Sequence, residues 1–286
     1  MNNNVTIIVP AFNEEESIES VASSLLKAFP ECRILIIDDG STDETAQMAE
    51  KTGATVVRHT SNQGYGASLR TGILKAQTTF VLFCDADGQH RIEDVRHLME
   101  ARDEYDMIVG TRNADSHTPL NRAPGKFILK HFANFLAGEK IPDLNSGLRI
   151  LRRDVILKYI HLMPRGFSFS TTSTFALLKG YHDIAWIPII VQKRKGSSTV
   201  RQLKHGPQTM LLMLRLTVLF EPLKVFLSAA ATLMALSLTS LGIDIWSSGR
   251  FDIGDSTVLL SITTLLTFLF GLVCDQVSAI RRELHD

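Results

Sequence analysis

Cysteine is scarce in this chain, and neither sign of charge is in excess. The three cysteines, Cys32, Cys84 and Cys274, lie far apart and form no CxxC pair. Their number and spacing exclude a disulfide framework and a zinc site built from thiolates. Thirty Lys and Arg balance thirty Asp and Glu, so the formal net charge is +0. We therefore expect no nucleic-acid partner and no strongly acidic substrate.

The start of the sequence lacks the basic segment of a signal peptide, and its first apolar run, 5–10, has only the length of a strand. We therefore expect the large N-terminal part to stay in the cytosol. The chain has 286 residues, of which 45% are hydrophobic and 21% are charged. This composition excludes a disordered or collagen-like protein, and the length suits about two domains.

Short apolar runs alternate with amphipathic segments over the first 110 residues. Strands are expected at 5–10, 33–37, 55–58, 80–84 and 107–109. Helices are expected at 14–29, 42–51, 67–76 and 92–104, the first with Asn13 as N-cap and Glu16 as its capping-box partner. This alternation predicts an α/β fold with a mainly parallel sheet covered on both faces. Ligands of such sheets lie at the carboxyl ends of the strands.

The pattern is looser between residues 110 and 200. A helical segment is expected near 126–136 and a strand at 186–191, which leads into the basic stretch 193–198. Segment 202–221 mixes long apolar side chains with a few cations, which is typical of a helix lying in a membrane interface. An ordinary amphipathic core helix is the alternative.

Two uncharged stretches, 225–243 and 256–274, follow. Each has 19 residues, so as a helix each is about 28 Å long and can just span a bilayer. Lys224 lies at one outer end and Arg281 and Arg282 at the other, whereas the connecting loop is mostly acidic, which favours two spans with both termini in the cytoplasm. A hairpin buried in a soluble core is the alternative.

Asp85 and Asp87 follow an apolar strand directly. An extended backbone would point them to opposite faces, but a turn at Gly88 can bring both toward one cation. Few oxygen ligands, with room left for water and phosphate, suit Mg²⁺ or Mn²⁺. Acidic residues also end the second expected strand, where Asp38 and Asp39 precede a segment, 41–43, that can cap the next helix. The glycine-bearing loop 62–66 is like a phosphate loop but lacks the full spacing of the dinucleotide fingerprint.

These segments, in this order, resemble glycosyltransferase family 2, the inverting enzymes with a GT-A nucleotide-binding fold. The most specific are VPAFNEEE at 9–16, IIDDGSTD at 36–43 and CDADGQH at 84–90, and the resemblance covers about residues 4–200. The later segments GTR at 110–112, DLNSGLR at 143–149 and KRKGSS at 193–198 are similar to polyprenol-phosphate sugar transferases of the dolichol-phosphate mannose synthase type.

The resemblance implies three groups of site residues. The nucleotide-sugar would be bound by Pro10, Ala11, Asn13, Glu14, Asp39, Asp85 and Ala86. The divalent ion would be held by Asp85, Asp87 and Gln89. The acceptor phosphate would be bound by Arg112, Arg122, Lys126, Ser146 and Arg194. Of these residues, those expected to carry catalysis are Asp87, Arg112, Arg122 and Arg194.

Two departures from the family narrow the reaction. The QxxRW motif of the processive polysaccharide synthases is missing, because neither Trp186 nor Trp246 follows an arginine, and this argues against a polymer-making enzyme. Segment 166–174 is rich in hydroxyls where many relatives carry an acid, so no protein general base is assigned. A lipid phosphate is already an anionic nucleophile at neutral pH and needs cations around it in place of a base.

The expected protein is thus a metal-dependent, inverting glycosyltransferase that moves one sugar from a UDP- or GDP-linked donor to a dolichyl or undecaprenyl phosphate at the cytoplasmic face of the cell membrane. Its expected parts are a GT-A domain at 1–200, an interfacial helix at 201–221 and a two-span hairpin with a cytoplasmic tail at 222–286. A tethered transferase with a non-lipid acceptor and a non-catalytic component that binds nucleotide-sugars or lipid-linked sugars are the alternatives. The sugar, the nucleotide, the polyprenol and the oligomeric state, a homo-oligomer included, stay open.

Overall fold

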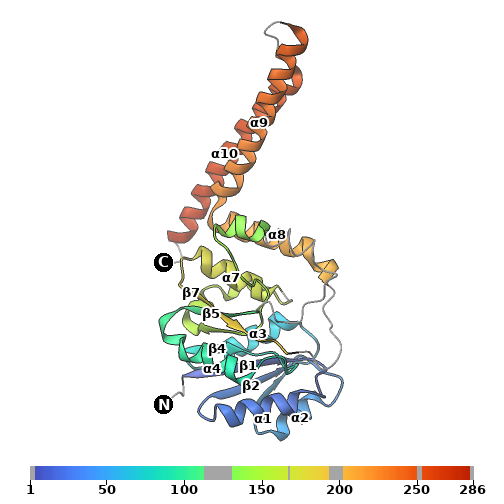
Figure 1. Ribbon diagram of the computed structural model, residues 1–286, viewed down its shortest axis with the longest axis vertical. Coiled ribbons are helices and arrows are strands. Elements are labelled where there is room, and N and C mark those ends of the chain that lie inside the picture. Colours follow the sequence, from blue (N-terminus) through green and yellow to red (C-terminus); the bar gives the residue numbers. More distant parts are fainter. Residues whose placement is uncertain (1–3, 113–130, 167, 193–201, 250–252, 284–286) are drawn as a thin grey trace.

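The computed structural model describes residues 4–112, 131–166, 168–192, 202–249 and 253–283. They form an α/β part that carries a long helical hairpin (Figure 1). The strands are β1 (Val5–Ala11), β2 (Arg33–Asp38), β3 (Thr55–Arg58), β4 (Phe80–Phe83), β5 (Met107–Arg112), β6 (Arg149–Arg152) and β7 (Ile184–Ile189). The helices are α1 (Ile18–Ala28), α2 (Thr45–Lys51), α3 (Tyr65–Lys75), α4 (Ile92–Glu100), α6 (Arg153–Lys158), α7 (Phe169–Lys179), α8 (Gln202–Phe220), α9 (Pro222–Ser248) and α10 (Asp255–Glu283), with short 3-10 turns at Arg102–Glu104 and Ile160–Leu162.

The sheet has seven strands in the order β3-β2-β1-β4-β6-β5-β7. The expected parallel pairing is confirmed for β1 with β2 and β4, for β2 with β3 and for β5 with β7. Strand β6 was not expected from the sequence and is antiparallel to both of its neighbours. Its short apolar pair, Ile150 and Leu151, lies between arginines and gives no periodic signal, so only the pairing with β4 and β5 reveals it.

Helices cover both faces of the sheet, as expected. Helices α1, α2 and α4 pack on one face, where Ile18, Leu25 and Leu98 join a core built from alternate residues of β1, β2 and β4. Helices α3, α6 and α7 pack on the other face, through residues such as Leu69 and Phe169. All seven residues of β1 are buried, because this central strand is covered on both sides.

Several expected helix boundaries differ from the structure, and the largest differences are in α1 and α4. Helix α1 begins at Ile18, after a turn, and not at residue 14, since the side-chain oxygen of Asn13 accepts a hydrogen bond from the backbone N–H of Thr42 (2.9 Å). Asn13 has a φ of 53°, so it is a left-handed turn residue and not an N-cap. Helix α4 ends at Glu100, and the last residues of its expected span form the separate turn Arg102–Glu104.

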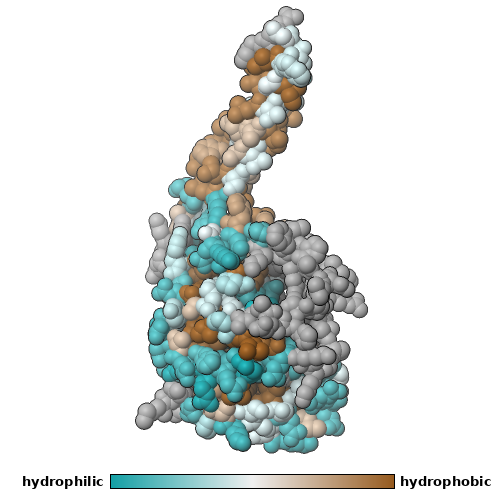
Figure 2. Space-filling model, in the orientation of Figure 1, coloured by the Kyte–Doolittle hydropathy of each residue, from teal (hydrophilic) through white to brown (hydrophobic). Residues whose placement is uncertain are grey.

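The C-terminal helices stand apart from the α/β part (Figure 1). Helices α9 and α10 lie antiparallel to each other, and both are long and apolar enough to cross a membrane. Only 11% and 17% of their most apolar windows are buried, so the alternative of a hairpin buried in a soluble core is wrong. Figure 2 shows that hydrophobic residues dominate the visible surface of the hairpin, whereas much of the α/β surface is hydrophilic.

Polar groups inside the hairpin pair with one another. The hydroxyls of Ser237 and Ser261 lie 2.8 Å apart, and the Thr257 hydroxyl donates to Asp244 Oδ2 at 2.8 Å. Asp244 also accepts from the backbone N–H of Gly254, just before α10 begins. A helix pair in lipid must satisfy its polar groups internally, and these contacts do so.

Helix α8 connects the hairpin to the α/β part. Met213, Leu216 and Phe220 of α8 pack with Phe175 of α7 and with the helical segment 131–137, which includes Leu136. At the start of α9, the buried ammonium of Lys179 donates to the Glu221 carboxylate at 2.6 Å and to the carbonyl of Ala137 at 3.0 Å. The expected interfacial helix therefore packs on the α/β part through one apolar face.

Candidate active site

The carboxyl ends of β2, β1 and β4 lie side by side at one edge of the sheet, because these three strands are adjacent and parallel. This edge brings together the segments 10–14, 38–43 and 84–90 that the sequence singled out. The backbone N–H of Asn13 donates to the Ser41 hydroxyl at 3.0 Å, and that of Glu14 donates to the Thr45 hydroxyl at 2.8 Å. The loops after β1 and β2 are thus tied into one wall.

Asp39 lies inside this wall and is 3% exposed. Its carboxylate accepts hydrogen bonds from the backbone N–H groups of Gln63 (2.9 Å) and Gly64 (2.8 Å), and His59 Nδ1 lies 2.7 Å away. The glycine-bearing loop therefore binds a protein carboxylate in this structure. A Cβ at Gly64 would lie 2.6 Å from the carbonyl oxygen of Arg165, so the glycine permits close packing on the segment before α7.

Asp85 and Asp87 follow β4 in a tight turn, as the sequence predicts. Gly88 has a φ of 71° and makes that turn possible. The backbone N–H of Gln89 donates to Asp87 Oδ1 at 3.1 Å, and Asp87 is 9% exposed. Tyr65 donates its hydroxyl to Asp85 Oδ1 at 3.0 Å, and burial, with Asp85 adding to it, raises the pKa of Tyr65 well above 10. Tyr65 therefore stays a neutral donor at physiological pH.

The aspartate turn fits a hard divalent cation that takes some of its ligands from the protein and the others from water and a bound phosphate. In the described part of the chain, no group of three or more His, Cys, Asp or Glu side chains is gathered as in a site closed by protein ligands. Mg²⁺ in phosphate-binding enzymes is typically held by one or two carboxylates together with water and substrate oxygens. Asp85 and Asp87 provide that minimum, and the side chain of Asp85 is 31% exposed.

Gln89, an expected metal ligand, is bound to Gln192 by two hydrogen bonds. Its side-chain amide N–H donates to the carbonyl oxygen of Gln192 at 2.7 Å, and the Gln192 N–H donates to the Gln89 carbonyl at 3.0 Å. Gln192 is the last described residue before the segment 193–201, which includes Arg194. The aspartate turn and the base of that segment are therefore joined directly.

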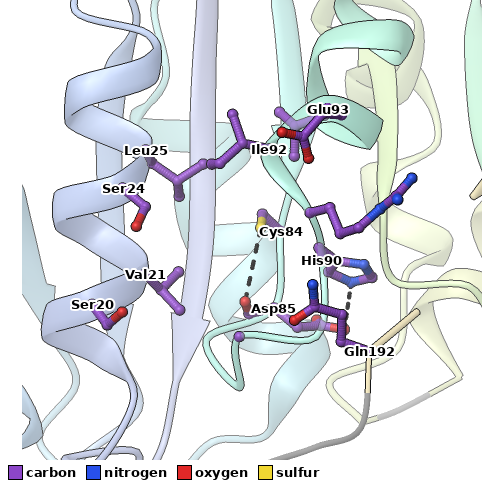
Figure 3. A pocket seen from close by; sticks show the side chains of 13 residues that line it. Ser20, Val21, Ser24, Leu25, Cys84, Asp85, His90, Ile92, Glu93 and Gln192 are labelled. Atoms are coloured by element: carbon purple, nitrogen blue, oxygen red, sulfur yellow. Dashed lines mark hydrogen bonds and ion pairs between the residues drawn. The ribbon is translucent and has the colours of Figure 1, made fainter. Parts of the chain in front are cut away.

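A pocket of about 250 Å³ lies beside the aspartate turn, between α1 and the start of α4 (Figure 3). Ser20 and Ser24 of α1 line one side, and Asp85, His90 and Gln192 line the other (Figure 3). His90 Nε2 lies 3.4 Å from Asp85 Oδ2. The pocket therefore extends the site from the strand ends toward the helix layer.

Arg112, at the end of β5, makes a two-pronged ion pair with Asp143. Its Nε lies 2.7 Å from Oδ2, and its Nη2 lies 2.8 Å from Oδ1. Burial alone would raise the pKa of Asp143, but the hydrogen bonds and charge of Arg112 outweigh it and lower the pKa. The pair therefore adds stability above the ordinary aspartate pKa of 3.8 and loses it as the pH falls through the lowered value.

The other expected acceptor residues divide into two groups. Ser146 is described, and it is buried at 4% exposure in the segment between Asp143 and β6. The remaining three lie outside the described residues: Arg122, Lys126 and Arg194. The nucleotide-sugar residues Pro10, Ala11, Asn13, Glu14, Asp39 and Ala86 all lie at the edge formed by β1, β2 and β4.

Sequence reasoning missed several residues that shape this edge. Tyr65 and His90 contact Asp85, and Asp143 pairs with Arg112, although none of the three was assigned a role. Each stands in a segment that the sequence had singled out. Tyr65 and Asp143 find their partners in other segments, and His90 reaches Asp85 through the fold of the turn within its own segment, so spacing alone did not reveal the contacts.

Comparison with solved structures identifies the fold. The chain is similar to glucosyl-3-phosphoglycerate synthase from Mycobacterium tuberculosis, solved in complex with Mn²⁺, UDP and glucosyl-3-phosphoglycerate. The TM-score is 0.63 at 18% sequence identity, over 76% of this chain and 80% of that one. The α/β part thus has the GT-A-like fold that the resemblance implied.

Family models and curated relatives place the chain more closely. The model for glycosyl transferase family 2 matches residues 6–160, and that for the GtrB C-terminal hairpin matches residues 221–280. The first match takes in more than half of the chain, which therefore belongs to glycosyl transferase family 2. The chain is 30% identical to glycosyltransferase AglJ of Haloferax volcanii, over 98% of this chain and 95% of that protein. It is 29% identical to polyprenol monophosphomannose synthase of Mycolicibacterium smegmatis, over 66% of this chain and 77% of that protein.

Proposed function

We propose that this protein transfers one sugar, with inversion, from a nucleotide-sugar to a polyprenyl phosphate at the cytoplasmic face of the cell membrane. The observation that carries the proposal is the joining, in one chain, of the aspartate turn after β4 to an exposed apolar hairpin. The name of the Mycolicibacterium smegmatis relative, a polyprenol monophosphomannose synthase, supports a lipid-phosphate acceptor. The match to the GtrB C-terminal hairpin supports membrane association.

The donor would lie across the carboxyl ends of β1, β2 and β4. Pro10, Ala11, Asn13, Glu14, Asp39 and Ala86 would bind its nucleoside part, and Asp85, Asp87 and Gln89 would hold Mg²⁺ or Mn²⁺. When bound, the cation would neutralise charge on the departing nucleoside diphosphate. The GT-A neighbour with bound Mn²⁺ and UDP supports this arrangement. Tyr65 and His90 orient the Asp85 carboxylate for that role.

The acceptor phosphate would be bound by a set of cations that includes Arg112, at the carboxyl end of β5. Arg112 presents a planar guanidinium, whose geometry matches phosphate oxygens, and Ser146 lies in the segment beside it. Arg122, Lys126 and Arg194 complete the proposed set. An anionic phosphate oxygen attacks the anomeric carbon without a protein base, which agrees with the hydroxyl-rich start of α7. In-line attack opposite the leaving group gives inversion.

Transfer to lipid is testable with the purified full chain. We expect one nucleotide-sugar, from a panel of UDP- and GDP-sugars, to yield nucleoside diphosphate together with a labelled product that extracts into organic solvent. The product should carry the anomeric configuration opposite to that of the donor. Sugar appearing only on a soluble acceptor would contradict the lipid acceptor. If none of the donors releases nucleoside diphosphate, the proposed enzymatic activity is contradicted and a non-catalytic component that binds nucleotide-sugars or lipid-linked sugars is favoured.

The proposed topology places both ends of the hairpin and residues 1–221 in the cytoplasm. In a chain with Cys274 replaced by alanine, we expect Ser248→Cys at the tip of the hairpin to react with a membrane-impermeant maleimide in intact cells. Glu50→Cys, exposed on α2, should react only after the membrane is opened. Background labelling should be low, because Cys84 is buried and burial, with Glu31 adding to it, raises the pKa of Cys32 to about 11.

Two outcomes would contradict this topology. Labelling of Glu50→Cys from outside would reverse the orientation and separate the site from cytosolic nucleotide-sugars. Labelling of neither position in intact cells would show that the hairpin does not cross the membrane. The expected pattern rests on the lysine and arginines at the outer ends of the hairpin, which resist translocation. Ser197, a second natural position for the cytoplasmic reporter, lies outside the described residues.

A further inference from the structure

The segment between Asp143 and β6 packs directly against the proposed metal ligand Asp85. A Cβ added to Gly147 would lie 3.0 Å from Asp85 Cγ and closer still to Oδ2. Contacts this short do not occur between a real Cβ and its neighbours, so any side chain here would displace the carboxylate. The position of Asp85 therefore depends on the absence of a side chain at residue 147.

Gly147 completes a clamp around the Asp85 carboxylate. Tyr65 donates to Oδ1 at 3.0 Å, His90 Nε2 lies 3.4 Å from Oδ2, and the Gly147 backbone closes a further side. The three groups come from α3, from the loop after β4 and from the segment before β6. The side chain of Asp85 is nevertheless 31% exposed, so the clamp fixes its direction and leaves one side open for a cation.

Arg149 anchors the same segment from below. Its Nη2 and Nε both donate to the carbonyl oxygen of Ser146, at 2.6 and 3.2 Å. Its Nη1 donates to the Ser170 carbonyl and to the Ser173 hydroxyl, both at 2.9 Å, and to the Thr174 hydroxyl at 3.3 Å. The guanidinium thus ties the residue before Gly147 to helix α7. The hydroxyl-rich segment that lacks an acid serves as a cradle for this cation.

Arg149 is 0% exposed and is not in an ion pair with any described residue. Burial lowers the pKa of Arg149 to about 10, and its proximity to Tyr65, Asp143 and Asp85 acts in the opposite direction. Arg149 is therefore a cation at neutral pH. Burying a charge without a paired carboxylate is costly, so a purely structural requirement would be met more cheaply by an apolar residue. Arg149 opens β6 next to the proposed binding site of two phosphate-bearing substrates, where its positive charge would favour their binding.

We propose that Gly147 and Arg149 are positioning residues, which hold the segment 146–148 so that the Asp85 carboxylate is fixed toward the cation of a metal–nucleoside diphosphate complex. This inference rests on the proposed function, since it assumes that Asp85 is a ligand of that cation. Ser146 lies in this segment, and Asp143, the ion-pair partner of Arg112, lies three residues before it, so the same anchor also sets the acceptor side of the site.

Binding of nucleoside diphosphate in the presence of Mn²⁺, measured by calorimetry on the full chain in detergent, tests the proposal without turnover. We expect Gly147→Ala to weaken this binding roughly ten- to a hundredfold, because the added methyl group displaces the Asp85 carboxylate from the position in which it would bind the cation. Gly242→Ala is the matched control, since its added methyl group meets nothing within 4 Å. Unchanged binding by Gly147→Ala would overturn the proposal.

Arg149→Lys and Arg149→Met separate the positive charge of Arg149 from the forked hydrogen bonding of its guanidinium. Lysine keeps the charge but cannot bridge Ser146 and α7 as a fork, so we expect both variants to weaken Mn²⁺–nucleoside diphosphate binding roughly tenfold or more. Rescue to wild-type binding by lysine would show that charge alone suffices and would overturn the role of the fork. Ser173→Ala removes one contact of Nη1 and should cause a smaller loss in the same assay.

Different results would contradict the positioning role of Gly147 and Arg149 and the proposed function. If the wild-type chain binds neither UDP nor GDP with Mn²⁺, the proposed donor site is wrong. If the wild type binds and the Gly147 and Arg149 variants bind equally well while remaining folded by circular dichroism, only the positioning role is wrong. If the Arg149 variants do not fold, Gly147→Ala and Ser173→Ala decide the question.

Discussion

Asp87→Asn should reduce transfer on the order of a thousandfold, a factor that corresponds to about 4 kcal/mol of transition-state stabilisation. The substitution removes one negative charge from the aspartate turn and keeps the size of the side chain. It also keeps Oδ1 as an acceptor for the backbone N–H of Gln89, so the turn should stay intact. The loss is expected in the initial rate measured with saturating donor and acceptor, and excess EDTA should suppress the wild type to a similar degree.

A surface aspartate provides the control for Asp87. Asp103→Asn, in the turn Arg102–Glu104, alters a carboxylate whose side chain is 71% exposed, and it should leave the rate unchanged. Raising the Mn²⁺ concentration should restore part of the activity of Asp87→Asn, because the remaining ligands bind the cation more weakly. Wild-type turnover by Asp87→Asn, or by the wild type in excess EDTA, would refute the metal site.

Arg112→Ala should raise the KM for the lipid acceptor roughly ten- to a hundredfold, because one charge-assisted contact with phosphate contributes about 1.5–3 kcal/mol. The KM for the donor should change little. The substitution also leaves Asp143, whose side chain is 11% exposed, without its ion-pair partner. We therefore also expect a lower melting temperature, since burial then acts on an unpaired carboxylate.

The double variant separates binding from this structural effect. Arg112→Ala with Asp143→Ala removes both members of the ion pair and should recover much of the lost thermal stability. If Arg112 binds the acceptor phosphate, the acceptor KM of the double variant stays high. If Arg112 serves only as the partner of Asp143, the double variant regains a wild-type KM, and Asp143→Ala alone matches Arg112→Ala.

Much of the sheet could be predicted from the sequence because its strands are short apolar runs between capped, amphipathic segments. Strand β3 falls at the expected residues, and β1, β2 and β4 differ from their expected spans by a residue. The turn at Gly88 and the exposed hairpin were also predicted correctly. In each case the signal is local: the period of hydrophobic residues, a glycine at a turn, or an uncharged stretch of spanning length.

Strand β6 and the start of α1 escaped prediction for a different reason. Arg149 opens a buried strand, and no rule of periodicity expects an arginine there. Its environment is built from Ser170, Ser173 and Thr174, which are distant in sequence. Asn13 has the character of an N-cap, but a bond to the loop after β2 offers its side chain a partner that a local pattern does not show.

The sequence by itself determined the class of fold, the carboxylates at the strand ends, the oxygen-rich ligand set that suits a hard cation, and two helices able to span a membrane. These properties follow from residue type and short spacing. Only the tertiary structure decided which groups orient those carboxylates: Tyr65, His90 and Gly147 around Asp85, and Asp143 against Arg112. The physical reason is that the contacts of Tyr65, Gly147 and Asp143 join elements separated in the chain and depend on strand order and close backbone packing, whereas that of His90 depends on how the turn after β4 folds back.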